Sequence, residues 1–212
     1  MTKKMHGLPI FKKAIRIATF VIIATALPSW ASQDQVTPPS FNADNTVNLP
    51  TGYRQWVHVG TRINTQGNNI IDSKPIAQPE ILNAYVEPSA FEHFKKTGQW
   101  ADGSQIVKEF SKVKTGEDCN PANFTCKTKI GTAIFQANYT GLGMMIKDSR
   151  RFSKENGYWG YFHFGHHEQP YNATSELRPT QQCAACHNAG AADQDYVFSS
   201  AHAGLRALLQ NP

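Results

Sequence analysis

The sequence has little surplus charge of either sign once its first 31 residues are set aside. The chain of 212 residues contains 21 Lys and Arg against 16 Asp and Glu, a formal charge of +5. Residues 1–31 hold five basic residues and no acidic one, so the remainder carries 16 of each sign. Such a balance lacks the basic excess that phosphate-backbone binding needs, and we expect no nucleic-acid partner. With 40% hydrophobic residues, the chain is also too apolar for a disordered protein.

Long hydrophobic runs are also missing. The longest near the start, Ile17 to Leu27, would rise only ~16 Å as a helix, against the ~30 Å of a bilayer core. It follows basic residues that end at Arg16 and precedes small residues that end at Ala31, which is the pattern of a secretory signal peptide. We expect residues 1–31 to be removed, leaving a protein without a membrane anchor. The compartment would be the periplasm of a Gram-negative host, where thiols meet oxidising conditions.

The rest of the chain is divided by composition into two parts. Residues 32–49 are polar and rich in Pro and Asn, which indicates an extended lead-in, and residues 50–212 form one domain. A helix is expected over Pro88 to Lys96. Strands are expected at Ile81–Val86, Gln105–Val113, Ala133–Tyr139, Gly141–Lys147 and Tyr158–Phe164, and a loop over Gln169–Thr180. This order predicts an α+β fold with a predominantly antiparallel sheet and a few short helices.

Cysteine is scarce, and two of the four cysteines form a specific motif. Cys183 and Cys186 are followed directly by His187, the CxxCH spacing in which two thiols bond to haem and the imidazole ligates its iron. A disulfide, a thioredoxin-like redox pair and half of a zinc site are the alternatives. There is no second CxxC for a zinc ribbon, and a redox pair belongs early in a βαβ unit. We therefore expect one covalently bound haem c.

The other two cysteines, Cys119 and Cys126, enclose six residues, which is too wide a spacing for a haem motif. This spacing suits a structural disulfide that closes a short loop. Such a bond would stabilise the fold by ~2–3 kcal/mol on the loop-entropy estimate.

The sequence resembles the cytochrome P-460 family, which includes the cytochromes c′-beta, across most of residues 50–212. The resemblance is carried by short motifs in a shared order: Tyr53-Arg-Gln-Trp56, Gly60-Thr61, Ala84-Tyr-Val-Glu-Pro88, Gly98-Gln-Trp-Ala-Asp-Gly103, Val107-Lys-Glu109, Lys147-Asp-Ser149, Arg151-Phe152, Trp159, Cys183 to His187, and Val197-Phe198. It implies a mostly antiparallel β haem domain, commonly a homodimer, with His187 as the proximal ligand and an exchangeable distal face.

Lys108 is the position that the resemblance marks for activity. In enzymes of the P-460 type, the lysine of a Val-Lys-Glu strand motif is bonded to the haem macrocycle, and Val107-Lys108-Glu109 matches that motif. The strand pattern also places Lys108 between Ile106 and Phe110 on one face. A lysine there must reach solvent, meet an anion such as a haem propionate, or be consumed in a bond.

Two distal residues that the resemblance would supply are replaced in this chain. Leu82 stands where active members have an arginine, and Gly143 stands where they have a glutamate. The loss of a carboxylate that relays protons could stall a reaction at nitric oxide. An apolar pocket is typical of the c′-beta gas binders, and Phe91, Phe94 and Phe135 are candidate caps, with core packing as the alternative.

The remaining candidates have ordinary structural explanations. Met144 or Met145 could supply a sixth iron ligand, although core packing accounts for methionines in a strand equally well. His163, His166 and His167 lie close together in sequence but lack the carboxylate spacing of a metal site beyond Glu168.

The sequence thus predicts an exported mono-haem cytochrome that binds a small diatomic or hydroxylamine-like ligand. In the leading hypothesis it oxidises hydroxylamine or nitric oxide and passes electrons to a soluble cytochrome. The alternatives are a non-catalytic cytochrome c′-beta that binds nitric oxide or carbon monoxide, and a simple electron carrier.

Overall fold

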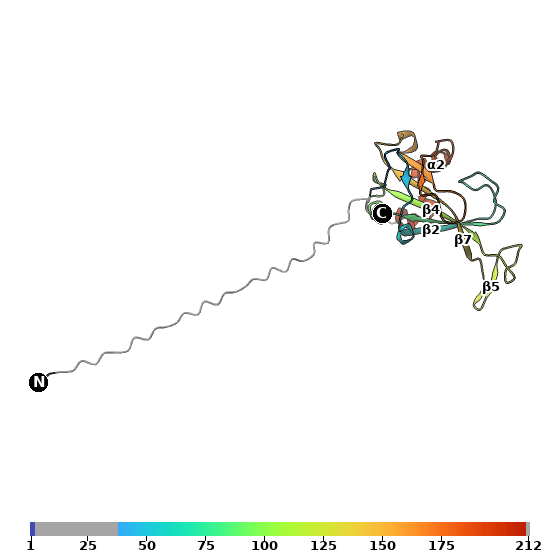
Figure 1. The fold of residues 1–212 in the computed structure, drawn as a ribbon, viewed down its shortest axis with the longest axis horizontal. Coiled ribbons are helices and arrows are strands. Elements are labelled where there is room, and N and C mark those ends of the chain that lie inside the picture. Colours follow the sequence, from blue (N-terminus) through green and yellow to red (C-terminus); the bar gives the residue numbers. More distant parts are fainter. Residues whose placement is uncertain (3–37, 211–212) are drawn as a thin grey trace. The chain divides into compact units, whose positions relative to one another are not determined.

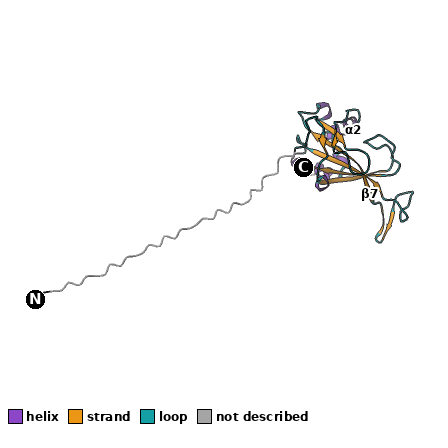
Figure 2. Ribbon diagram, in the orientation of Figure 1, coloured by secondary structure: helices purple, strands orange, loops and turns teal. Residues whose placement is uncertain are grey.

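The fold is built on one antiparallel sheet, seen here in a computed structural model that describes residues 1–2 and 38–210 (Figure 1). The strand order is β2-β3-β4-β7-β8. The strands are β2 (Val57–Asn64), β3 (Glu80–Val86), β4 (Gln105–Val113), β7 (Gln136–Lys147) and β8 (Trp159–His163). The described part of the chain adds three α-helices: α1 (Pro88–Thr97), α2 (Cys183–Ala191) and α3 (Ala203–Gln210). The predicted α+β class with a predominantly antiparallel sheet is confirmed (Figure 2).

The two faces of the sheet belong to separate hydrophobic cores. Val59, Ala84, Ile106, Met145 and Tyr161 face the helices, and pack with Ala90 of α1, Ala184 of α2 and Leu205 of α3. The opposite face contributes Val107, Leu142, Met144 and Phe162, which pack with Val47, Tyr53 and Tyr171. This division follows from the alternation of side chains along a strand. We call these the helix-side core and the loop-side core.

The first helix has the ends that its sequence predicts. Pro88 begins α1, and the side chain of Glu87 caps it by accepting a hydrogen bond from the Ala90 amide at 2.9 Å. Gly98 ends it in the left-handed conformation, with φ of 70°. Phe94 then stacks on Trp100, with ring centroids 4.1 Å apart, which makes Phe94 part of the helix-side core.

The prediction of two strands over 133–147 is wrong, because β7 runs without a break from Gln136 to Lys147. The pairing of β4 with β7 shifts register between Phe110 and Ser111, and a bulge of this kind bends a strand without ending it. Residues before β7 form the short hairpin of β5 (Cys126–Thr128) and β6 (Gly131–Ala133), which projects from the sheet (Figure 1). A disulfide joins Cys119 to Cys126 at its base, as predicted.

The segment before the sheet and the segment after it meet on the loop side. β1 (Val47–Asn48) pairs antiparallel with β9 (Thr174–Ser175), which is the one short strand within the predicted loop 169–180. Val47 is buried in the loop-side core although it belongs to the stretch 32–49. The expected signal peptide falls almost entirely on residues 3–37, outside the described residues. Among the described residues, no helix has the length and apolar character that crossing a bilayer requires.

Candidate functional site

Helix α2 presents the cysteine pair and the histidine from one short segment. Cys183 and Cys186 are both free thiols, the first half-buried and the second exposed, and they lie about one helical turn apart. Ala184, between them in sequence, is buried in the helix-side core and anchors the helix on the sheet. The two thiols and His187 are therefore held in fixed relation to the cavity that α2 borders.

The ring of His187 has one nitrogen engaged by the protein. Its Nδ1 lies 2.7 Å from the carbonyl oxygen of Tyr196, which can only accept, so Nδ1 carries the proton and Nε2 keeps its lone pair. The ring centroid is 4.8 Å from that of Tyr161 and 5.0 Å from that of Phe198. Burial, with a smaller contribution from the charge of Lys108, lowers the pKa of His187 to about 4. A neutral imidazole with Nε2 free is the form that ligates a metal.

A largely apolar cavity lies between α2 and the helix side of the sheet. It is partly open to solvent, and its lining is predominantly apolar. Its wall includes Cys183 and His187 of α2 and Ile106, Phe110 and Met145 of the sheet. Cys183 and His187 thus border a largely apolar space, which has the character that a flat, apolar cofactor needs.

The strand register places Lys108 at the centre of the sheet wall. Lys108 pairs with Gly143, and Gly143 pairs with His163, so the three residues form one cross-strand row. The next row contains Met145 paired with Tyr161, the residue that contacts His187. Directly paired residues point to the same face of an antiparallel sheet. Lys108, Gly143 and His163 all line the cavity accordingly.

Lys108 is half-buried and makes no hydrogen bond or ion pair within residues 38–210. Burial, aided by the nearby charge of Arg62, lowers the pKa of Lys108 to about 8. The predicted face is confirmed, since Ile106 and Phe110 line the same cavity on either side of it. Lys112, which follows on the same face of β4, lies outside the cavity lining and forms an ion pair with Glu168 at 3.2 Å.

Two further polar atoms of the cavity wall have no partner in the part of the chain that the structure describes. The hydroxyl of Tyr161 and Nδ1 of His163 are buried and make no hydrogen bond to any described residue. Burial raises the pKa of Tyr161 and lowers that of His163, so both side chains are held neutral near pH 7. Because buried polar groups are normally hydrogen-bonded, these two side chains are available to a ligand in the cavity.

The predicted distal residues are only partly brought together. Gly143 lines the cavity, whereas Leu82 is buried on the same sheet face one row away from Lys108 and does not reach the lining. Phe91 packs against the helix-side core, outside the lining. Phe135 precedes β7 and is 38% exposed, so it caps no part of the cavity. Met145 lines the cavity from the helix-side core, and Met144, although it also borders the cavity, packs in the loop-side core.

The cavity wall that the sequence did not predict is the loop 65–79 between β2 and β3. It contributes Ile70 and Ile71 to the lining. Asn69 is buried and donates to Glu80 at 2.7 Å, and its side-chain oxygen accepts from the Ile71 amide at 2.8 Å. Polar contacts of this loop thus place its two isoleucines over the cavity.

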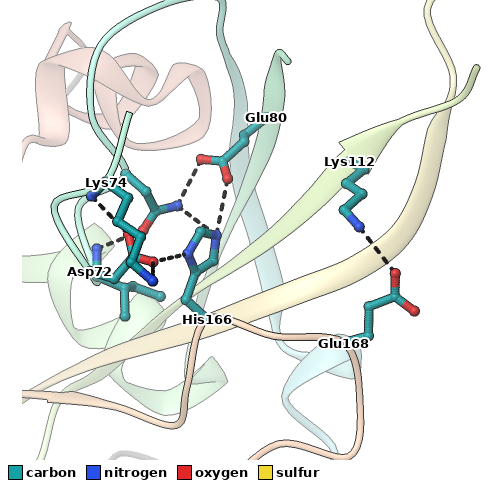
Figure 3. Close-up of polar contacts among 8 residues, drawn as sticks. Asp72, Lys74, Glu80, Lys112, His166 and Glu168 are labelled. Carbon is teal, nitrogen blue, oxygen red and sulfur yellow. Dashed lines mark hydrogen bonds and ion pairs between the residues drawn. The ribbon is translucent and has the colours of Figure 1, made fainter. Parts of the chain in front are cut away.

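His166 fastens the same loop to the sheet. It lies between two carboxylates, with Nδ1 2.9 Å from Asp72 and Nε2 3.1 Å from Glu80 (Figure 3). His167 and His163 are not part of this contact, so the predicted sequence cluster is dispersed. No group of three or more His, Cys, Asp or Glu side chains that could hold a metal ion occurs among the described residues.

On the loop side of the same sheet, the Glu109 carboxylate accepts several side-chain hydrogen bonds that the sequence did not predict. It is fully buried and accepts hydrogen bonds from the hydroxyls of Tyr53 at 2.6 Å and Tyr171 at 3.0 Å. Arg54 forms a two-point contact with it, through Nε at 3.0 Å and through Nη2. The sequence shows the motifs that contain Tyr53 and Glu109, but no local pattern indicates that the two motifs are in contact.

Taken together, the fold and the site define a haem-protein class: two free thiols and a neutral imidazole lie on one helix, and Cys183 and His187 border a largely apolar cavity against an antiparallel sheet. The residues present fit a haem attached through Cys183 and Cys186 and ligated by His187. The sequence profile of the cytochrome P460 family matches residues 50–199, and the chain belongs to that family. No curated protein matches the chain in a direct sequence comparison.

Proposed function

We propose that the protein is an exported mono-haem cytochrome that oxidises hydroxylamine or nitric oxide and passes the electrons to a soluble cytochrome. The observation that carries this proposal is the placement of Lys108 in the wall of the cavity that α2 borders. Family membership supports haem and small nitrogen ligands. A bound haem would supply the iron at which such a ligand coordinates and through which its electrons leave.

Each named residue has a separate task in this proposal. Cys183 and Cys186 tether the macrocycle, and His187 offers Nε2 to the iron. The isoleucines of loop 65–79 and Phe110 give the cavity an apolar wall that disfavours water. The unpartnered Nδ1 of His163 can accept a proton released when the substrate is oxidised. This imidazole is the one neutral base in the row of Lys108 and Gly143.

Lys108 is proposed to be bonded to the macrocycle. Its lowered pKa, about 8, leaves a fraction of the amine uncharged and nucleophilic near neutral pH. Replacing a carbon–hydrogen bond of the macrocycle by a carbon–nitrogen bond removes two electrons and two protons, so formation of this link requires a two-electron oxidant such as a peroxide. The link would alter the electronic structure of the macrocycle, one of the means by which proteins tune haem.

The test is mass spectrometry of the digested holoprotein together with its ferrous spectrum. We expect the peptide containing Lys108 to be joined to haem and the Soret band to be red-shifted. Lys108→Tyr should restore the spectrum of an ordinary c-type haem, whereas Lys112→Tyr, on the same strand but outside the cavity, should leave it shifted. An unmodified Lys108 in mature holoprotein would overturn the enzyme proposal.

The apolar lining favours a second candidate, a cytochrome c′-beta that binds nitric oxide or carbon monoxide without turnover. Ile70, Ile71 and Phe110 disfavour water and anions at an open iron site, and Gly143 offers no carboxylate. This candidate predicts an unmodified Lys108, five-coordinate haem, and gas binding without oxidation of hydroxylamine.

Met145 is the observation behind a third candidate, a simple electron carrier. A six-coordinate low-spin spectrum without added ligand, lost in Met145→Ala, would favour it. Met144→Ala is the matched control, because Met144 packs in the loop-side core.

The proposed function also includes a periplasmic location, a homodimer and a soluble cytochrome as electron acceptor. Sedimentation of the secreted protein and stopped-flow reduction of an added c-type cytochrome test them.

A further inference from the structure

The turn that follows α2 has a backbone conformation that is unusual for its residues. Asp195 and Tyr196 are consecutive and neither is glycine, yet both lie in the left-handed region, with φ of 52° and 61°. L-residues with side chains seldom adopt this region, and runs of two are rarer still. Strain of this kind persists only where surrounding contacts impose it, and it clusters at functional sites.

This turn supplies the hydrogen bond that orients His187. The carbonyl oxygen of Tyr196 accepts from Nδ1 of His187 at 2.7 Å. A partner at this nitrogen fixes the rotation of the ring and raises the donor strength of Nε2. The direction of the carbonyl depends on the backbone angles of the turn, so whatever holds the turn also sets this bond.

Two residues at the end of the sheet hold Asp195. Nζ of Lys147, the last residue of β7, lies 2.5 Å from the Asp195 carboxylate, and the Lys147 side chain is only 13% exposed. The indole N–H of Trp159 donates to the Asp195 carbonyl oxygen at 2.9 Å. Lys147 and Trp159 are themselves paired across β7 and β8. The sheet therefore holds both the side chain and the backbone of this residue.

Tyr196, the next residue of the turn, is held by close packing against Gly157. A side chain at Gly157 would meet the Tyr196 ring, since a Cβ placed there would lie 2.1 Å from its nearest ring atom. Glycine at this position gives the Tyr196 ring its place against the chain before β8. Asp195 and Tyr196 are therefore held by an ion pair, a hydrogen bond and a close packing contact, although neither residue lines the cavity.

We propose that Lys147 and Asp195 are positioning residues that hold the turn and thereby set the strength of the bond between His187 and the haem iron. The inference rests on the proposed haem attachment. A well-placed acceptor at Nδ1 makes the imidazole a stronger donor, which favours ferric iron and lowers the reduction potential. Loosening the turn should weaken the bond and raise the potential.

The experiment uses the holoprotein and compares Lys147→Met with Lys112→Met. Each substitution removes a strand lysine that pairs with one carboxylate, but only Lys147 contacts the turn. Resonance Raman spectra of the ferrous protein should show a lower iron–histidine stretching frequency in Lys147→Met, and redox titration a higher midpoint potential. Lys112→Met should match the wild type in both.

Substitutions at Asp195 separate positioning from general stability. Asp195→Asn tolerates the left-handed conformation and keeps an acceptor for Lys147, so it should stay close to the wild type, whereas Asp195→Ala should shift like Lys147→Met. Unchanged frequency and potential in Lys147→Met and Asp195→Ala holoprotein would overturn this inference alone. Wild-type protein without covalent haem would overturn it together with the proposed function.

Discussion

Glu109 stands next to Lys108 in β4, but the two side chains point to opposite faces of the sheet. Lys108 lines the cavity, and Glu109 gathers Tyr53, Arg54 and Tyr171 on the loop side. A fully buried carboxylate is tolerable because several donors and one cation compensate for the water it has lost. Of these two adjacent residues, Lys108 belongs to the cavity wall and Glu109 contributes to the stability of the fold.

Glu109→Ala should destabilise the protein without removing any residue of the cavity wall. The substitution leaves two tyrosine hydroxyls without their acceptor, and unsatisfied buried groups cost about 1–3 kcal/mol each. Urea unfolding followed by circular dichroism should give a correspondingly lower free energy of unfolding. Tyr171→Phe, which removes one donor and keeps the carboxylate, should lose about 0.5–1.5 kcal/mol. Equal stability of Glu109→Ala and the wild type would contradict this account.

The limits of sequence reasoning at the residue scale are visible in the same network. The alternation of β4 was sufficient to predict that Lys108 lies between Ile106 and Phe110 on one face, because that signal is local. The contact between Arg54 and Glu109 spans 55 positions in the chain, and no local pattern encodes it. The sequence shows His163 as one of three clustered histidines, and strand alternation over the segment Tyr158–Phe164 also places it on the same face as Tyr161.

At the scale of elements, strands with regular alternation were predicted and weakly patterned elements were not. The bounds predicted for β4 are those observed, and β3 differs by one residue. The sequence does not predict strand β2, because this edge strand is largely exposed and mixes His58, Gly60 and Arg62 with its apolar residues. Helix α2 is rich in Ala and has no apolar stripe, so its position depends on tertiary contacts.

Loop 65–79 is the element whose mobility should control entry to the cavity. Asn69→Ala removes the buried amide that joins Glu80 to the Ile71 backbone, and local opening should become easier by about 1–3 kcal/mol. Amide hydrogen exchange over 65–79 should then accelerate by a factor of about 5 to 150. Asn138→Ala, which removes an exposed amide bound to Glu168, is the matched control. Exchange unchanged by Asn69→Ala would mean that other contacts hold the loop.

At the scale of the whole molecule, buried tyrosines should govern stability at alkaline pH. Burial raises the pKa of Tyr53, Tyr161 and Tyr171 in the folded state, and Glu109 adds to the effect at the first and last. Unfolded tyrosines ionise near pH ~10, so above that pH the unfolded state binds fewer protons than the folded state. The free energy of unfolding is therefore fully retained below pH ~10 and falls as the pH rises further.

Urea unfolding at several pH values above ~10 measures this loss, which should approach ~1.4 kcal/mol per pH unit for each tyrosine held protonated. Lys108, with its pKa lowered to about 8, has the opposite effect: its contribution makes the free energy of unfolding rise with pH between about 8 and the unfolded lysine value of ~10.4, so it overlaps only the start of this window. Tyr171→Phe should reduce the slope. A slope that Tyr171→Phe leaves unchanged would show that this side chain is not among the groups responsible.

The alternation of β4 has a consequence for how the chain avoids misfolding. A slip of one residue against β3 would turn the Glu109 carboxylate into the apolar cavity and drive the Lys108 ammonium against Tyr53 and Arg54. Both errors would be costly, and they would occur together. The neighbouring charges of opposite sign therefore disfavour every slip of β4 against β3 by an odd number of residues, because each such slip would place both side chains on the wrong face of the sheet.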